Sequence, residues 1–334
     1  MRTATVFFVN LTLGLLLLGF VVWHYGGPAL QVLGADPSAL MLLAFVATAV
    51  VTVVCLSWRW GYVLAGLSQN LSLVKLALFR SCAHTLAALI PSGKLGGDPL
   101  RVFLAIRSGV PAGDGVASVT VDRTQEIGST APFSLIFAAL LLQANIPHIE
   151  RALITVLVGT FGLVLGSILA VRRLRRGAGL VSALVRATRM DRLAFIKSQH
   201  EVIGAAERSV LALADQTQRM LVAFLAGLVA NLLVVAEFWF LLVAFDLPSD
   251  TTAIAAALFA TGAAHLLPVP AGIGVLEGAQ MWIFGMLGYS ENVGLAVGLA
   301  VRLRELVWIL PGTIYMLGWS PLKGAHSQSG ADLN

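Results

Sequence analysis

Charged residues are scarce in this chain, and their scarcity defines its class. They make up 12% of the 334 residues, whereas hydrophobic residues make up 58%. A soluble domain carries about 25% charged residues. The mean hydropathy is +0.87. The composition excludes a soluble domain with a single anchor. It predicts an all-α polytopic membrane protein, for which the bilayer is the apolar solvent.

Cysteine and the common catalytic motifs are also nearly absent. The two cysteines, Cys55 and Cys82, lie in apolar runs, which argues against a disulfide framework. The sequence has no HExxH, EF-hand, zinc-finger spacing, G-x-S-x-G or nucleotide-binding loop. We therefore predict no catalytic residues, no metal and no cofactor, and nothing in the sequence indicates an ATPase.

The apolar runs predict about six transmembrane helices. They cover residues 5–25, 39–58, 115–143, 150–171, 220–245 and 291–319. Trp23-His24-Tyr25 close the first helix as an interfacial aromatic belt would, and we expect the second helix to end at Trp58-Arg59-Trp60. A signal peptide is the alternative for residues 5–25. It is disfavoured because no small-residue cleavage site is clear and more spans follow.

Two apolar stretches are broken by proline and glycine. Proline and glycine at this density cannot lie in an unbroken membrane helix without releasing backbone hydrogen-bonding groups. We therefore predict two re-entrant helical hairpins, at 73–107 and 252–289, with full, split spans as the alternative. In the first, Asp98 is expected to cap a short helix that begins with Pro99. The predicted hairpin-tip residues are Pro91, Gly93, Gly96, Gly97, Pro268, Pro270, Gly272 and Gly274.

The same order of features follows both breaks. Arg123 lies 32 residues after Pro91, and Arg302 lies 34 residues after Pro268. Each arginine begins an Arg-x-x-Glu motif, and a proline follows nine residues later. This recurrence predicts an inverted repeat. Paired Gly/Pro-interrupted segments in two halves are a pointer to a transporter's binding site.

The repeat and the charge distribution together predict the domain organisation. Residues 172–219 carry a net charge of +6, which leaves −1 for the rest of the chain. The positive-inside rule then places this connector and both termini in the cytoplasm. It also makes the two hairpins enter the membrane from opposite sides. The predicted divisions are a first repeat at 1–171, a basic connector at 172–219, a second repeat at 220–320 and a polar tail at 321–334.

Charged residues at bilayer depth are the candidate site. Arg302 lies 11 residues into the last span, about 16 Å deep at 1.5 Å per residue. Such a residue is retained where it pairs, faces a cavity or binds something. A structural salt bridge between the repeats is one interpretation, and a polar site for a lipid headgroup is the other. The candidate headgroup-binding residues are Arg123, Glu126, Arg302, Glu305, Lys94, Asp98, Arg101 and Glu277.

Several of these residues have a plainer interpretation. Lys94 and its glycines could cradle a phosphate, or simply form a turn between helices. Glu277 could complement the dipole of a helix N-terminus, or meet a cationic group or a proton. Asp122 and Arg304 add a further charge to each site. His84 and His265 precede the breaks, and a histidine in an apolar run is usually a packed polar residue.

These motifs resemble the lysylphosphatidylglycerol synthase transmembrane family, the membrane half of the bacterial multiple peptide resistance factor and its stand-alone relatives. The most specific match is Leu-Pro-Val-Pro-Ala-Gly-Ile-Gly-Val-Leu-Glu at 267–277, followed by Ala-Val-Arg-Leu at 300–303. Val-Asp-Arg at 121–123 and the proline, glycines, acidic residue and Leu-Arg near 91–101 are looser matches. The resemblance covers roughly 5–320, and Ala271 stands where relatives often have glycine.

The resemblance implies movement of a lipid between the leaflets of a bacterial inner membrane. Because the chain ends at Asn334, it implies translocation without lipid synthesis. The expected partner is a membrane lipid: a phospholipid, an aminoacyl-phospholipid, or a hopanoid or polyprenyl lipid. A lipid-synthesis enzyme and a second copy of the chain are further candidate partners, and no nucleic acid is expected. Two alternatives remain: a non-catalytic membrane subunit that recruits a lipid-synthesis enzyme, and a lipid-modifying membrane enzyme.

Overall fold

The computed structural model describes residues 23, 27–34, 36–90, 96–144, 149–176, 200–267 and 269–318. Every regular element in these ranges is helical. The predicted span at 5–25 lies almost entirely outside the described residues, as do the middle of the basic connector and the tail. The elements are α2 (Ala39–Ala65), α3 (Leu73–Leu89), α4 (Asp98–Arg107), α5 (Ala112–Gln143), α6 (Ile149–Arg175), α9 (His200–Ala214), α10 (Thr217–Ala244), α11 (Thr251–Leu266), the short 3₁₀ helix η2 (Pro270–Gly272), α12 (Val275–Met286) and α13 (Glu291–Gly318).

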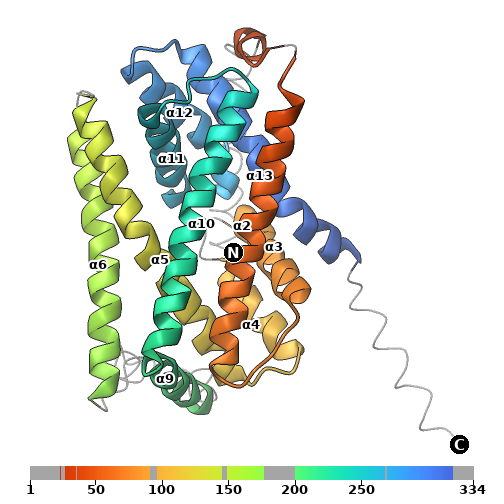
Figure 1. Ribbon diagram of the computed structural model, residues 1–334, viewed down its shortest axis with the longest axis vertical. Coiled ribbons are helices and arrows are strands. Elements are labelled where there is room, and N and C mark those ends of the chain that lie inside the picture. Colours follow the sequence, from red (N-terminus) through yellow and green to blue (C-terminus); the bar gives the residue numbers. More distant parts are fainter. Residues whose placement is uncertain are drawn as a thin grey trace, which may run out of the picture.

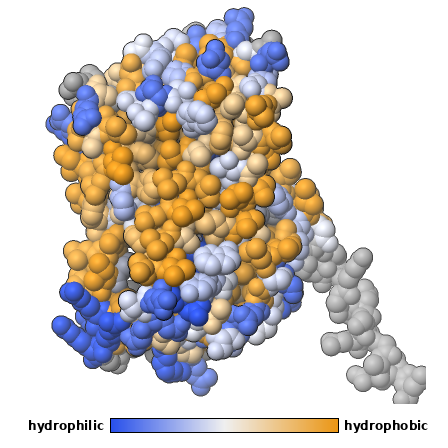
Figure 2. All heavy atoms as spheres, in the orientation of Figure 1, coloured by the Kyte–Doolittle hydropathy of each residue, from blue (hydrophilic) through white to orange (hydrophobic). Residues whose placement is uncertain are grey.

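The long helices match the predicted spans to within a few residues. Four described helices, α2, α5, α6 and α10, are long and apolar enough to cross a membrane. Helix α13 has the length but carries three charged side chains in its middle, Arg302, Arg304 and Glu305. Figure 2 shows hydrophobic residues across the middle of one face and hydrophilic residues gathered at both ends. This pattern is that of a multi-pass membrane protein.

Both predicted hairpins are present as pairs of helices that meet at a break. Helices α3 and α4 form the first, and α11, η2 and α12 form the second. In Figure 1, α4 lies toward the lower end of the molecule, whereas α11 and α12 lie toward the upper end. The break segment η2 packs against α3. The two broken segments therefore approach one another in the interior.

The order of a long helix, a broken hairpin and a long helix occurs twice. It is α2, α3–α4 and α5 in the first half, and α10, α11–α12 and α13 in the second. Helix α2 packs along α10, α13 packs on α3, and α5 packs on α11. Each hairpin thus contacts the long helix that follows the other hairpin. This exchange brings the charged residues of both halves to one central region.

Two local predictions were wrong. Helix α2 continues to Ala65, so Arg59 and Trp60 lie inside it and are fully buried rather than at the interface. The reason is a buried acidic partner for Arg59, described below. Gly97 caps α4, so Asp98 is the first residue of that helix and not its cap. The Asp98 carboxylate instead lies near arginines.

Helix α6 stands at the edge of the bundle. It packs on α5 and α9 (Figure 1). Many of its large apolar side chains are exposed, including Ile154, Val158, Phe161 and Leu165. A soluble protein rarely exposes so continuous an apolar surface, whereas a lipid-facing helix requires one.

Candidate functional site: a buried charged cavity between the two halves

A buried carboxylate joins four helices of the first half. Asp122 on α5 is 0% exposed. It accepts hydrogen bonds from Arg59 Nε at 2.8 Å, Arg80 Nη2 at 2.7 Å and Arg101 Nη2 at 2.6 Å. These arginines come from α2, α3 and α4. Because three guanidinium groups converge on one carboxylate, the cluster fixes the relative positions of the helices that carry them.

Glu126 lies one turn further along α5 and faces the same arginines. Its carboxylate is 3.5 Å from Arg59, 3.6 Å from Arg80 and 2.8 Å from Arg123. Asp98 approaches Arg123 at 3.7 Å. Four arginines thus meet three carboxylates, so this first-half cluster carries a net positive charge. Several of its cations remain able to attract an anion.

The second half builds its cluster on Glu277, which is also 0% exposed. Arg302 Nε and Nη2 donate to the two oxygens of Glu277 at 2.7 and 3.0 Å. Arg302 Nη1 donates to Glu305 at 2.6 Å, and Nη2 also donates to the carbonyl of Gly272 at 3.0 Å. Glu277 in turn accepts from the Gly274 amide at 2.9 Å. It therefore closes the N-terminal cap of α12 and pairs with Arg302 of the same chain, and its predicted role toward a lipid headgroup stays a prediction.

The hairpin-tip glycines of the second half are required by the backbone. Gly272 and Gly274 have φ of +59° and +77°, a region that side-chain-bearing residues rarely adopt. These conformations turn the Gly272 carbonyl and the Gly274 amide toward the charged residues named above. Pro91, Gly93, Lys94 and Pro268 lie outside the described residues.

A third buried carboxylate connects the halves. Glu237 on α10 is 0% exposed. It accepts hydrogen bonds from Arg304 Nε at 2.7 Å and Trp308 Nε1 at 3.2 Å, both on α13, and from the hydroxyl of Thr52 on α2. It lies in the middle of an apolar run, where a buried acid needs such partners. It therefore fixes α13 against the α2–α10 pair.

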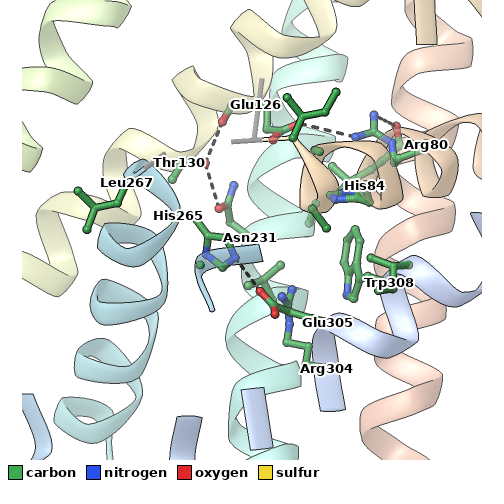
Figure 3. Close-up of a pocket in the computed structure, with 18 of the residues that line it drawn as sticks. Arg80, His84, Glu126, Thr130, Asn231, His265, Leu267, Arg304, Glu305 and Trp308 are labelled. Carbon is green, nitrogen blue, oxygen red and sulfur yellow. Dashed lines mark hydrogen bonds and ion pairs between the residues drawn. The ribbon is translucent and has the colours of Figure 1, made fainter. Parts of the chain in front are cut away.

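A cavity of about 240 Å³ lies between these clusters. Figure 3 shows Arg80 and Glu126 on one side, His265, Glu305 and Arg304 on the other, and the rings of His84 and Trp308 packed against each other. Arg59, Thr130, Asn231 and Gly272 also line it. The cavity therefore draws charged groups from both halves of the chain, which is where the repeat predicted a site.

Two cavity arginines keep N–H groups without a partner. Arg59 and Arg80 are 0% and 3% exposed. Arg59 Nη1 and Arg80 Nε are buried and have no hydrogen-bond acceptor among the described residues. A buried donor that lacks a partner costs about 1–3 kcal/mol, and more when it is charged. Both atoms are enclosed by protein, so an anion in the cavity would meet the positive charge of the two guanidinium groups and not these N–H groups.

A second, apolar chamber of about 470 Å³ adjoins the charged cavity. It lies between α5, α6, α10 and α11, and its walls include Phe133, Leu153, Phe238 and Phe259. Five residues line both spaces: Glu126, Thr130, Asn231, Val234 and Arg304. The two spaces thus meet at a polar boundary. One wall of the apolar chamber is α6, the helix at the edge of the bundle.

The predicted site residues are only partly at the cavity. Glu126, Glu305 and Gly272 line it. Arg123, Arg302 and Glu277 lie behind these residues and pair with them or with one another. Arg101 is buried against the Trp60 ring at 4.2 Å. Asp98, Arg101, Gly96, Gly97, Pro270 and Gly274 do not line the cavity.

The sequence interpretation missed Arg59, Arg80, Glu237 and Asn231. Arg59 lies between two tryptophans at the predicted end of the second span, so no local pattern indicated that it is buried inside a helix. Glu237 carried a usable signal, because an acidic residue in the middle of an apolar span is costly and is retained for a partner or a function. Arg80 carried the same signal on its apolar run.

Two comparisons with known proteins bear on this site. The family model described as Lysylphosphatidylglycerol synthase TM region matches residues 7–312. That range contains every described charged residue of the cavity. A search of curated proteins gives no match.

Proposed function

The chain belongs to the lysylphosphatidylglycerol synthase transmembrane family, and we propose that it moves a phospholipid or a related lipid between the two leaflets of a membrane without hydrolysing ATP. The family and the helical fold support a lipid-related membrane role. Movement between leaflets and the kind of headgroup go beyond that role and are proposals.

The observation that carries the proposal is the junction of a charged cavity and an apolar chamber. A soluble ion would need only the charged cavity, and a hydrocarbon would need only the apolar chamber. The boundary residues Glu126, Asn231 and Arg304 line both spaces. A molecule with a charged headgroup and an acyl chain would satisfy both at once, with the headgroup between the halves and a chain along α6.

The arginines favour an anionic group on that molecule. Arg59 and Arg80 both line the charged cavity, and guanidinium groups suit phosphate oxygens in both charge and geometry. Glu126 and Glu305 line the same cavity and would meet any positive part of the headgroup. A phosphate-bearing lipid therefore fits this site better than a neutral one.

The test fills the apolar chamber without disturbing the charged cavity. Gly262 on α11 lines the chamber, and a Cβ built there meets nothing within 4 Å. A tryptophan is therefore accommodated at its Cβ, and its ring in Gly262→Trp should obstruct the acyl chain. Gly162→Trp on α6 is the matched control, because that position is equally open and lies outside the chamber.

The measurement is lipid movement in proteoliposomes that contain headgroup-labelled phosphatidylglycerol, lysyl-phosphatidylglycerol or a neutral lipid. We expect the protein to move one of the charged lipids, so that its labelled headgroup loses the protection given by the leaflet in which it started. We also expect a reduction of at least about tenfold in Gly262→Trp, equivalent to 1.4 kcal/mol, and little change in Gly162→Trp. Folded protein that moves none of the lipids would overturn the proposal, and equal rates in the two variants would refute the assignment of the chamber.

A further inference from the structure

Both ring nitrogens of His265 face oxygen atoms. Nδ1 lies 2.6 Å from the backbone carbonyl oxygen of Thr261, and Nε2 lies 2.6 Å from Oε1 of Glu305 (Figure 3). A carbonyl oxygen only accepts hydrogen bonds, so Nδ1 carries a proton. The Nε2–Oε1 contact then needs a proton of its own, because a bare nitrogen lone pair and a carboxylate would repel at that distance.

We infer that His265 and Glu305 form a proton-binding site that is loaded and unloaded during lipid movement. The inference rests on the proposed function for its role, but the proton count rests on geometry alone. The bound proton lies on Nε2, giving an imidazolium beside a carboxylate. The pair then holds one proton more than a neutral histidine beside an ionised glutamate.

The charges around the pair favour this extra proton. Among the described residues of the second-half cluster, Arg302 pairs with both Glu277 and Glu305, and Arg304 pairs with Glu237. Two carboxylates held together away from water are costly, and a proton on the pair reduces their negative charge. The charged and titratable groups that line the cavity on other helices are Arg59 on α2, Arg80 and His84 on α3, and Glu126 on α5.

The pair also holds the broken hairpin to α13. His265 lies in the last turn of α11, just before the break. On the far side of the break, Arg302 holds the Gly272 carbonyl and Glu277. When the proton leaves, the Nε2–H bond breaks, its electron pair stays on nitrogen and the proton passes to a water molecule. Nε2 and Oε1 then repel, so the α11 end of the break is released from α13.

The location of the pair links this step to the lipid. His265 and Glu305 are 11% and 21% exposed at their side chains, and both line the charged cavity. A proton can therefore exchange with water in the cavity when no headgroup fills it. Release of the break would change the same wall that a headgroup contacts, so proton binding and lipid movement would be coupled.

The first test measures transport against pH in proteoliposomes, with and without an imposed pH gradient. We expect the wild-type rate to change with pH, with a slope of at most about tenfold per pH unit for one proton, and to respond to the gradient. His265→Gln keeps a hydrogen-bond donor but binds no proton, so its rate should lose both responses. His84→Gln is the control at the same cavity: whatever its rate, its pH response should match that of the wild type.

The second test needs no transport. Nitrogen NMR of isotope-labelled histidine in nanodiscs, assigned by loss of the signal in His265→Gln, reports whether one or both ring nitrogens are protonated. We expect the signal of His265 to show the bound proton at neutral pH, and Glu305→Gln to give an ordinary neutral ring.

The outcomes separate the two claims. Active protein with a pH-independent rate, or a neutral His265 ring unchanged by Glu305→Gln, would overturn the proton site and leave lipid movement standing. Protein that moves no lipid would overturn the proposed function, and the NMR result would then decide the proton site by itself.

Discussion

The two halves of the molecule carry the same Arg-x-x-Glu motif in different surroundings. Arg123 pairs with Glu126 at 2.8 Å, and Arg302 pairs with Glu305 at 2.6 Å. In the first half the neighbouring buried acid, Asp122, is held by three arginines. In the second half the neighbouring buried acid, Glu277, is held by one arginine, Arg302. The spacing therefore specifies the pair, whereas the packing of other helices decides whether its environment is cation-rich or cation-poor.

This difference assigns different roles to the two clusters. The first-half cluster joins α2, α3, α4 and α5 through several charged contacts, so it forms a rigid wall with surplus positive charge. The second-half cluster includes His265 and lies at a break in the helix, where Gly272 and Gly274 have φ above zero. We predict that this broken segment is the part that moves.

The largest effect that would test this contrast is on stability. Asp122→Asn removes the shared carboxylate of three buried arginines, and breaking a buried ion pair costs about 3–5 kcal/mol. Glu277→Gln should cost less, because Arg302 keeps Glu305 and the Gly272 carbonyl. Thermal unfolding in detergent checks the order. Equal losses in the two variants would show that the halves are equally rigid.

A second contrast concerns lipid movement. Arg302→Ala leaves the fully buried Glu277 without a cation and frees the break, so the rate in proteoliposomes should fall about tenfold or more, the equivalent of one lost charged hydrogen bond of about 1.5–3 kcal/mol. Arg123→Ala should have a smaller effect, because Glu126 keeps Arg59 and Arg80 nearby. The rate of Arg302→Lys should lie between those of Arg302→Ala and Arg123→Ala, because lysine keeps the charge but cannot make the paired contacts of arginine. A larger effect of Arg123→Ala would reverse the assignment of the mobile half.

The smallest expected effects compare two glycines. At Gly312 on α13, an added Cβ would lie 2.3 Å from the backbone carbon of Ser81 on α3. Gly312→Ala should therefore separate these helices and cost about 1–3 kcal/mol. At Gly278 on α12 an added Cβ meets nothing within 4 Å, so Gly278→Ala should gain about 0.5–1 kcal/mol from helix propensity. Thermal unfolding distinguishes the two signs, and a stable Gly312→Ala would show that the two helices are not in close contact.

Much of the fold was predictable because its signals are local. Long apolar runs fix the helices, and the bounds of α5, α6, α10 and α13 follow the predicted spans closely. Proline and glycine fix the breaks, because their backbone chemistry acts on adjacent residues alone. The Arg302–Glu305 and Arg123–Glu126 pairs follow from the helical repeat, which places residues three apart on one face.

The cavity was less predictable because its partners are far apart in the sequence. Arg59 and Asp122 are 63 residues apart, and Thr52 and Glu237 are 185 apart. Nothing local to Arg59 indicated that α2 would continue and bury it. Asn231 gave no signal either, since a single amide in an apolar helix has no pattern of its own.

The sequence by itself determined the membrane class, the helices, the two breaks and the family, because apolar content, backbone chemistry and short motifs need no knowledge of contacts. Only the tertiary structure decided which carboxylate meets which arginine, that His265 reaches Glu305, and that a charged cavity adjoins an apolar chamber. The physical reason is that helices of similar composition can pack in many ways. Buried charges select among these ways, since each must find a partner away from water.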